Sequence, residues 1–357
     1  MITDRRKFLA GLLATGLVPK PTWADAGSPE FLSAAALTDG TFVLCGIDAN
    51  LNVPFTLPLP GRGHAAAAHP KRPEAVAFAR RPGTFAVVID CTTGVQKAVL
   101  HAPKGRHFYG HGIFSTDGAT LFTTENDYEA GQGRIGVWDV TSNYARIDEW
   151  SSGGIGPHDI KRLPNSDVLV VANGGIETHP DTGRTKLNIP TMQPNLSYIR
   201  NGELLDVVEL PKEMHKHSIR HLAVSQDGGV AFGMQQQGDS TAKALVGHHR
   251  LGARVALMQA DLNQMRDMNG YVGSIAISRD STSIVATSPR GDVAQFYDAN
   301  TSEITETQYL PDVCGAATTA HGFLLTSGTG ELLLKRGSAH ISSRIDGLSW
   351  DNHLIAI

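Results

Sequence analysis

The chain has 357 residues, which is enough for one large domain or two ordinary ones. Charged residues make up 18% of it and the formal net charge is −4, so we expect no nucleic-acid partner. Glycine, with 38 residues, suits many tight turns between short strands. After residue 24 no uninterrupted apolar run reaches membrane-spanning length, so we expect no membrane span in the mature protein.

The first 26 residues have the pattern of an export signal. Arg5 and Arg6 stand in a Thr-x-Arg-Arg-x-Phe-Leu setting, and a short apolar stretch with small residues follows. This pattern is similar to a twin-arginine signal, which predicts cleavage near Ala24 or Ala26 and a periplasmic location. An ordinary secretory signal or a membrane anchor is the alternative. The twin-arginine route carries folded proteins, often with a cofactor already loaded.

From residue 27 onward, a unit of strand, tight turn and strand recurs along the chain. Leu-Thr-Asp-Gly at 37–40 and Ser-x-Asp-Gly at 115–118 and 225–228 are typical turns, each flanked by apolar and β-branched residues. Two units gain a third strand that ends in Trp138-Asp139 or Tyr297-Asp298. The units begin near residues 31, 64, 110, 157, 219, 273 and 314.

Seven such units predict an all-β fold, a seven-bladed β-propeller of the YVTN or WD40 type, as a single domain over 27–357. The C-terminal stretch "DNHLIAI" is expected to close the ring beside the first unit. Helical character is expected only in the signal and at 260–268. Long insertions at 177–195 and 238–254 are expected on the working face, although they could be surface elaborations without a role.

Histidines recur at one register of these units. The positions four residues before the turn are Ser33, His64, His111, Asp159, His221, Ser274 and Gly315, and His158 precedes Asp159. This register lies at the start of the innermost strand, at the mouth of the central channel. Imidazoles that converge there from separate blades would form a transition-metal site. The predicted ligands are His64, His111, His158 and His221, with His107 and His217 as a second tier.

His107 and His111 are four residues apart, as are His217 and His221. Neither pair can chelate one ion by itself, because residues four apart in an extended strand are separated by about 13 Å. Coordination would therefore have to join different blades. The alternative is that these histidines line the channel and bond to backbone or water. His107 and His217 lie closer to the position that a structural Gly-His dipeptide takes in Trp-Asp repeats.

Four cationic side chains are expected to bind an anionic ligand or cofactor over the channel mouth. Arg220 and Arg290 are expected beside inner strands, and Arg184 and Lys186 belong to the first insertion. The alternative is that the insertion cations only anchor their loop. Cys45, Cys91 and Cys314 form no Cys-x-x-Cys-His motif, so we expect no covalent haem.

Several long motifs carry a resemblance to a known family. "FYGHGIFSTDGATLFTTENDYEAGQGRIGVWD", "GIGPHDIKRLPNSDVLVVANGGIETHPDTGRTKLN", "LVGHHR", "TSPRG" and "DVCGAA" resemble the bacterial domain-of-unknown-function family 1513 over nearly the whole mature chain. The resemblance implies an exported seven-bladed propeller, encoded beside imelysin-type periplasmic proteins and di-haem peroxidase-like proteins. That setting implies iron acquisition or periplasmic metal handling, with an imelysin-type or haem-protein partner.

The leading hypothesis is a periplasmic propeller that binds a transition metal at its channel mouth, with iron as first candidate and copper or zinc as others. A propeller enzyme, either a lactonase or an oxidoreductase, would use the same mouth. A metal-free scaffold for an imelysin-like partner is the third reading. No nucleophile elbow, His-Glu-x-x-His motif or phosphate-binding glycine loop is present in the sequence.

Overall fold

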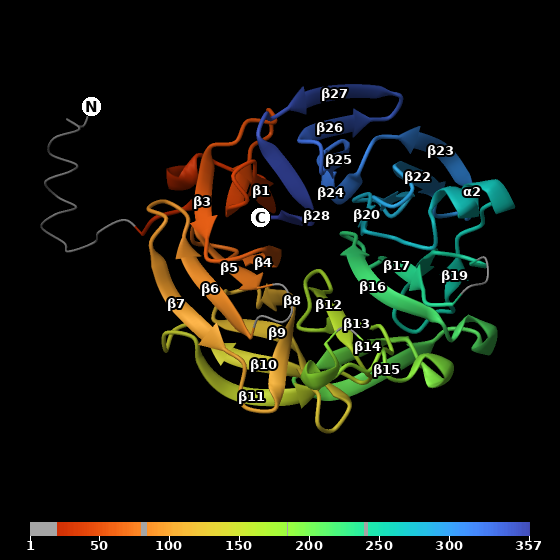
Figure 1. The fold of residues 1–357 in the computed structure, drawn as a ribbon, viewed down its shortest axis with the longest axis horizontal. Helices are drawn as coiled ribbons and strands as arrows, with labels where there is room; N and C mark the ends of the chain where they lie inside the picture. The colour runs from red at the N-terminus through yellow and green to blue at the C-terminus, as the bar shows by residue number, and fades with distance from the viewer. Residues whose placement is uncertain (1–19, 80–83, 184, 239–241) are drawn as a thin grey trace, which may run out of the picture.

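The computed structural model describes residues 20–79, 84–183, 185–238 and 242–357. Over these residues the strands form seven four-stranded antiparallel sheets, arranged as blades around a central axis (Figure 1). The predicted seven-bladed β-propeller is confirmed. Residues 1–19 of the predicted signal peptide lie outside the described residues, and Trp23–Ala26 form a short 3-10 helix, η1. The indole of Trp23 donates a hydrogen bond to the carbonyl of His69 at 2.9 Å.

The blades are numbered from the N-terminus, and each is given with its innermost strand first. Blade 1 is β28 (Leu348–Ala356), β1 (Phe31–Leu37), β2 (Phe42–Ile47) and β3 (Phe55–Leu59). Blade 2 is β4 (Gly63–Ala68), β5 (Glu74–Ala79), β6 (Phe85–Asp90) and β7 (Gln96–His101). Blade 3 is β8 (Arg106–Phe114), β9 (Thr120–Asp127), β10 (Gln132–Asp139) and β11 (Ala145–Ser151). Blade 4 is β12 (Pro157–Arg162), β13 (Leu169–Asn173), β14 (Asn195–Arg200) and β15 (Glu203–Glu209).

The remaining blades follow the same order. Blade 5 is β16 (His217–Val224), β17 (Val230–Gln236), β18 (Val246–His249) and β19 (Ala256–Leu257). Blade 6 is β20 (Ser274–Ile277), β21 (Ser283–Ser288), β22 (Val293–Asp298) and β23 (Ile304–Tyr309). Blade 7 is β24 (Val313–Thr319), β25 (Gly322–Ser327), β26 (Glu331–Arg336) and β27 (Ala339–Arg344).

In the part of the chain that the structure describes, helices are few and short. The expected helical stretch near 260–268 is α2 (Leu262–Asp267), which Asp261 caps by accepting hydrogen bonds from the N–H groups of Asn263 and Gln264. Short 3-10 helices occur at η2 (Pro180–Thr182), η3 (Ile189–Thr191) and η4 (Lys212–Met214). Among the described residues, no helix has the length and apolar character needed to cross a bilayer.

The C-terminal strand closes the ring. β28 pairs antiparallel with β1, so the expected pairing of the C-terminal stretch with the first unit is confirmed. β28 also takes the innermost place in blade 1, next to the axis (Figure 1). The expectation that the unit at residue 31 begins with an innermost strand is therefore wrong. β1 is the second strand of its blade, and Ser33 lies away from the ring register, where its hydroxyl donates to the carbonyl of His353 at 3.0 Å.

The hydrophobic core is divided among the blade interfaces. The buried apolar side chains of the described residues form seven clusters, and each cluster joins two neighbouring blades. Between blades 7 and 1, for example, Leu324 and Leu334 pack with Trp350 and Leu354 of the closing strand. Burial of apolar surface between adjacent sheets therefore holds the ring together.

The predicted insertions share one face of the ring. Neighbouring strands are antiparallel, so each connection from a second to a third strand lies at the same end of its blade as the start of the innermost strand. The first insertion runs between β13 and β14, and the second lies between β17 and β18. Both therefore lie at the face where the innermost strands begin, which we call the mouth face. The second is shorter than predicted, because Val246–His249 form β18 within the predicted range 238–254.

We predict that shortening one side chain of the closing strand destabilises the whole ring. Leu354 is 6% exposed in the cluster between blades 7 and 1, so Leu354→Ala should lower the free energy of unfolding by about 2–4 kcal/mol. Ile341→Ala on the outermost strand β27 is the control. Its side chain is 56% exposed, and the expected loss is below about 0.5 kcal/mol. Urea denaturation followed by circular dichroism measures both, and equal losses would contradict the closure role of β28.

Candidate metal centre

Five histidines from five consecutive blades meet at the axis, near the mouth face. They are His353 of blade 1, His64 of blade 2, His111 of blade 3, His158 of blade 4 and His221 of blade 5. We call them the histidine cluster. The ring centroids are 4.5 Å apart for His111 and His353, 4.6 Å for His64 and His353, 4.9 Å for His111 and His158, 5.0 Å for His158 and His221, and 5.2 Å for His221 and His353. The structure thus brings all four predicted first-tier histidines together.

Irregular pairing in the innermost strands accompanies this arrangement. Register shifts occur at 63–66 in β4, 108–112 in β8, 157–159 in β12, 219–221 in β16 and 313–316 in β24, and in β28 opposite 33–35 of β1. β20 is regular over its four paired residues. A bulge bends its strand and re-aims a side chain, and every cluster histidine lies in or directly beside one.

Gly110 shows why the bulge in β8 needs glycine. Its φ of +101° lies in a region that other residues avoid. A Cβ atom at this position would also lie 2.4 Å from Cδ2 of His64. The Gly110-His111 pair therefore allows two blades to approach so closely that His64 and His111 come within 5.0 Å of each other, centroid to centroid.

Asp159 orients the ring of His111. Its Oδ1 lies 3.1 Å from Nδ1 of His111, and its Oδ2 accepts a hydrogen bond from the backbone N–H of Leu222 at 2.9 Å. Burial opposes ionisation of Asp159, but the charge of Lys161 at 3.0 Å and the bonds from His111 and Leu222 hold its pKa well below the ordinary value. An ionised carboxylate can only accept, so Nδ1 of His111 carries the proton and its Nε2 lone pair remains for a ligand.

A backbone carbonyl orients His158 in the same way. Nδ1 of His158 lies 2.9 Å from the carbonyl oxygen of Arg220, which can only accept a hydrogen bond. Nδ1 is therefore the protonated nitrogen, and Nε2 is the nitrogen with the lone pair. His111 and His158 thus both have the tautomer that metal-bound histidines have when a carboxylate or carbonyl fixes the other nitrogen.

Several cluster nitrogens are buried without a hydrogen-bond partner. Within the described part of the chain, this holds for Nε2 of His111, His221 and His353. Buried polar atoms are nearly always paired, so three such imidazole nitrogens at one site are suited to bind a water molecule, a ligand or an ion.

Burial also keeps the imidazoles neutral, which is the state that binds metals. It lowers the pKa of His111, and it lowers the pKa of His221 to about 3. The pKa values of His158 and His353 also lie well below the ordinary value, again chiefly because of burial and then because of neighbouring cationic or imidazole groups. No proton has to be displaced from these rings at neutral pH before they can bind a cation.

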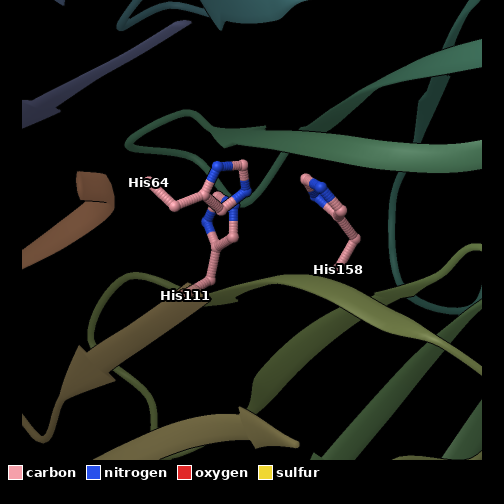
Figure 2. A group of neighbouring side chains, drawn as sticks. All are labelled: His64, His111 and His158. Carbon is pink, nitrogen blue, oxygen red and sulfur yellow. The ribbon is translucent and has the colours of Figure 1, made fainter. Parts of the chain in front are cut away.

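Three members approach the geometry of a metal site most closely. One nitrogen each from His64, His111 and His158 lie within 4.8 Å of one another, and Figure 2 shows their side chains converging from three directions. Ligands at 2.0–2.1 Å from a tetrahedral ion are about 3.4 Å apart. Movement of each nitrogen by less than about 1 Å would close the remaining gap, which is within the range of small side-chain rotations.

The predicted second tier lies outside the cluster. Both nitrogens of His107 have hydrogen-bond partners: Nδ1 lies 3.2 Å from the carbonyl of Phe108, and Nε2 lies 3.1 Å from the amide nitrogen of Asn126. The same amide donates to the carbonyl of Thr178, so His107 helps to anchor the first insertion. Nδ1 of His217 bonds the carbonyl of Met214 at 3.2 Å, in the short helix η4 (Lys212–Met214) that precedes its strand.

A cavity of about 160 Å³ opens above the cluster on the mouth face. Four cluster histidines line it together with Arg220, Gln235, Tyr271 and Asn352. On the other side of the cluster, a second cavity of about 310 Å³ follows the axis. It is lined mainly by small and apolar side chains of the innermost strands, such as Ala67, Ala276 and Leu354. The polar approach to the cluster is therefore from the mouth face.

The predicted cations are found around this mouth. Arg220 lines the cavity directly, and the guanidinium of Arg290 lies 4.2 Å from the ring centroid of Tyr271, which also lines it. Arg290 belongs to the turn between β21 and β22, so its predicted place beside an inner strand is wrong. Lys186 belongs to the first insertion and donates to Oε1 of Gln237. Arg184 lies outside the described residues.

His353 is the cluster member that the sequence reasoning missed. The available signal was the predicted closure: a strand that completes the ring from the C-terminus has to occupy one of the seven innermost places. His353 stands in that strand, four residues before the last residue of the chain. The other cluster histidines stand four or five residues before the turn that ends their own strand, so His353 has the equivalent place. Aligning the first unit on Ser33 instead placed a second strand in a register that belongs to β28.

Comparisons with known proteins place the chain in a family without assigning it an activity. No curated protein matches the chain in sequence. Among solved structures, the hydrazine synthase of Kuenenia stuttgartiensis is similar in fold, with a TM-score of 0.58 and 13% identity over 89% of this chain and 96% of that chain. The model of the family described as a protein of unknown function, DUF1513, matches residues 57–357, and the chain belongs to this family.

Proposed function

We propose that this propeller binds one transition metal ion at the histidine cluster and serves metal handling in the periplasm. The observation that carries the proposal is the meeting of five imidazoles from five blades, three of them with a buried Nε2 atom that no described residue bonds. His64, His111 and His158 would provide the first three nitrogen ligands, and His221 and His353 flank them. A carboxylate and a carbonyl behind two of the rings complete a metal-binding pattern.

The donor set favours particular ions. Neutral imidazole nitrogens suit zinc, copper, iron and nickel, whereas calcium and magnesium prefer oxygen ligands. The carboxylate of Asp159 bonds a histidine and a lysine and is thereby held behind the cluster. Iron is our first candidate within this group, because the family resemblance implies an iron-handling setting.

One observation also favours a metal-dependent enzyme at the same place. The cavity above the cluster would leave room for a water molecule or a small substrate beside a metal held by three histidines. Such an open position is what metal-assisted catalysis requires. Turnover of a lactone or a redox substrate by metal-loaded protein, but not by the metal-free protein, would support this second function.

We predict that protein purified from the periplasm contains about one equivalent of a transition metal per chain. Elemental analysis of the exported protein, before and after reconstitution with Fe²⁺, Co²⁺ or Zn²⁺, is the measurement. His111→Ala combined with His221→Ala should reduce the bound metal severalfold while circular dichroism shows an intact fold, because two of the converging rings are removed.

The matched control is His321→Ala combined with His340→Ala, which removes two exposed histidines far from the cluster. It should leave the metal content unchanged and exclude uptake by surface imidazoles. Less than about a tenth of an equivalent of any transition metal in wild-type protein, unchanged after reconstitution, would defeat the proposal.

Asp159→Asn tests the support behind the cluster. The amide keeps the shape of the side chain but lacks the charge that holds the proton on Nδ1 of His111. We expect metal affinity to fall by about 10–100-fold, measured by competition with a chromogenic chelator. Glu331→Gln removes one carboxylate on β26, away from the cluster, and should leave the affinity unchanged. Equal affinities in all three proteins would remove Asp159 from the site.

We further propose that the chain reaches the periplasm through the twin-arginine route. The supporting observation is the Arg5-Arg6 pair in its Thr-x-Arg-Arg-x-Phe-Leu setting. Replacing both arginines by lysine should leave the protein in the cytoplasm, as measured by immunoblotting of cell fractions. Unimpaired export of the lysine variant would point to an ordinary secretory signal.

A further inference from the structure

The mouth above the histidine cluster has a strongly cationic rim. We call Lys186, Arg220 and Arg290 the basic mouth. Arg220 lies next to the cluster, since it lines the cavity and its carbonyl accepts a hydrogen bond from His158. Lys186 comes from the first insertion in blade 4, and Arg290 comes from a turn of blade 6. Three separate blades therefore bring positive charge to one opening.

These cations act on one another. Much of the Lys186 side chain is exposed, yet partial loss of water around its ammonium group, followed by the charges of Arg220 and Arg290, lowers its pKa. Like charges around one opening repel one another, and a bound anion would relieve that repulsion. Asp351 also lines the cavity, and its Oδ2 accepts a hydrogen bond from Arg62 at 2.9 Å.

The basic mouth is positioned for directional binding. The guanidinium of Arg290 lies over the ring of Tyr271, an arrangement that uses the flat face of the group and leaves its in-plane N–H donors for a ligand. Gln235 donates to the carbonyl of Val272 at 3.1 Å, which fixes the wall between blades 5 and 6. Guanidinium groups presented in this way bind carboxylates through paired hydrogen bonds.

The size of the cavity limits the ligand. Its volume of about 160 Å³ is smaller than the roughly 300–1,000 Å³ of pockets that enclose drug-sized molecules. A nucleotide or a folded partner therefore does not fit, whereas an anion of a few heavy atoms does. The floor of the same cavity is formed by His64, His158, His221 and His353, so a ligand at the basic mouth lies directly above the cluster.

We propose that the basic mouth binds a small dicarboxylate. One carboxylate lies among Lys186, Arg220 and Arg290, and the other reaches toward the histidine cluster and binds the metal there. The first contact stands on the cationic rim alone, whereas the second rests on the proposed metal function. The dicarboxylate would thus be the substrate or co-ligand of the metal centre, and cation repulsion would select against positively charged chelators.

Oxalate is the probe, and isothermal titration of Co²⁺-loaded and metal-free protein is the test. We expect oxalate to bind the Co²⁺-loaded protein about tenfold or more tightly than the metal-free protein, with a change in the visible absorption of Co²⁺. Lys186→Met combined with Arg290→Met should weaken oxalate binding to both forms by about tenfold or more, because two charged hydrogen-bond donors are lost. Co²⁺ content should stay the same, since neither residue contacts the cluster.

Arg200→Met combined with Arg336→Met is the matched control. Both arginines are exposed at the ends of third strands, on the face opposite the mouth, and their loss should leave oxalate binding unchanged. Three results would overturn the proposal: absence of oxalate binding to Co²⁺-loaded protein, equal binding by wild type and the Lys186/Arg290 variant, or extraction of Co²⁺ without a ternary complex. Oxalate binding that depends on Lys186 and Arg290 in protein that takes up no metal would support the basic mouth while rejecting the metal function.

Discussion

Closure of the ring by β28 is the contact on which the rest of the structure depends. A propeller blade buries both of its faces, so every sheet needs a neighbour on each side, and an open array would expose an apolar face at each end. β28 joins the C-terminus to β1 and supplies Trp350 and Leu354 to the interface between blades 7 and 1. The same strand places His353 near the axis, so β28 both closes the ring and completes the histidine cluster.

The blade is repeated seven times, but the residues that the blades place near the axis differ. Five consecutive blades present histidine near the mouth, whereas blade 6 presents Ser274 and blade 7 presents Cys314. Both of these bond the scaffold: the hydroxyl of Ser274 accepts from the N–H of Ala316 at 3.1 Å, and the Cys314 thiol lies 3.4 Å from the hydroxyl of Thr326. Burial raises the pKa of Cys314 to about 12, which keeps the thiol protonated. The axial imidazoles are thus confined to one arc of the ring.

Around this arc the polar groups form layers with different tasks. The cluster lies innermost, Asp159 and the Arg220 carbonyl fix the tautomers of two of its rings, and Lys161 compensates the charge of Asp159. Outside it stands the basic mouth, in which Lys186 comes from a loop and Arg290 from a turn, whereas Arg220 belongs to the innermost strand β16. The inner strands thus position the imidazoles, and side chains of a strand, a loop and a turn surround the opening that leads to them.

The sequence by itself determined the blade count, the closing strand and the register of four histidines, because turn residues and alternating apolar residues are local signals. It could not show that β28 is an innermost strand, and so His353 was missed, or that His107 and His217 lie outside the cluster. Those points depend on β-bulges and on contacts between blades such as Gly110 against His64, which join residues far apart in the chain. Only the closed ring decided them, since side-chain direction at a bulge is set by the partner strand and the neighbouring blade.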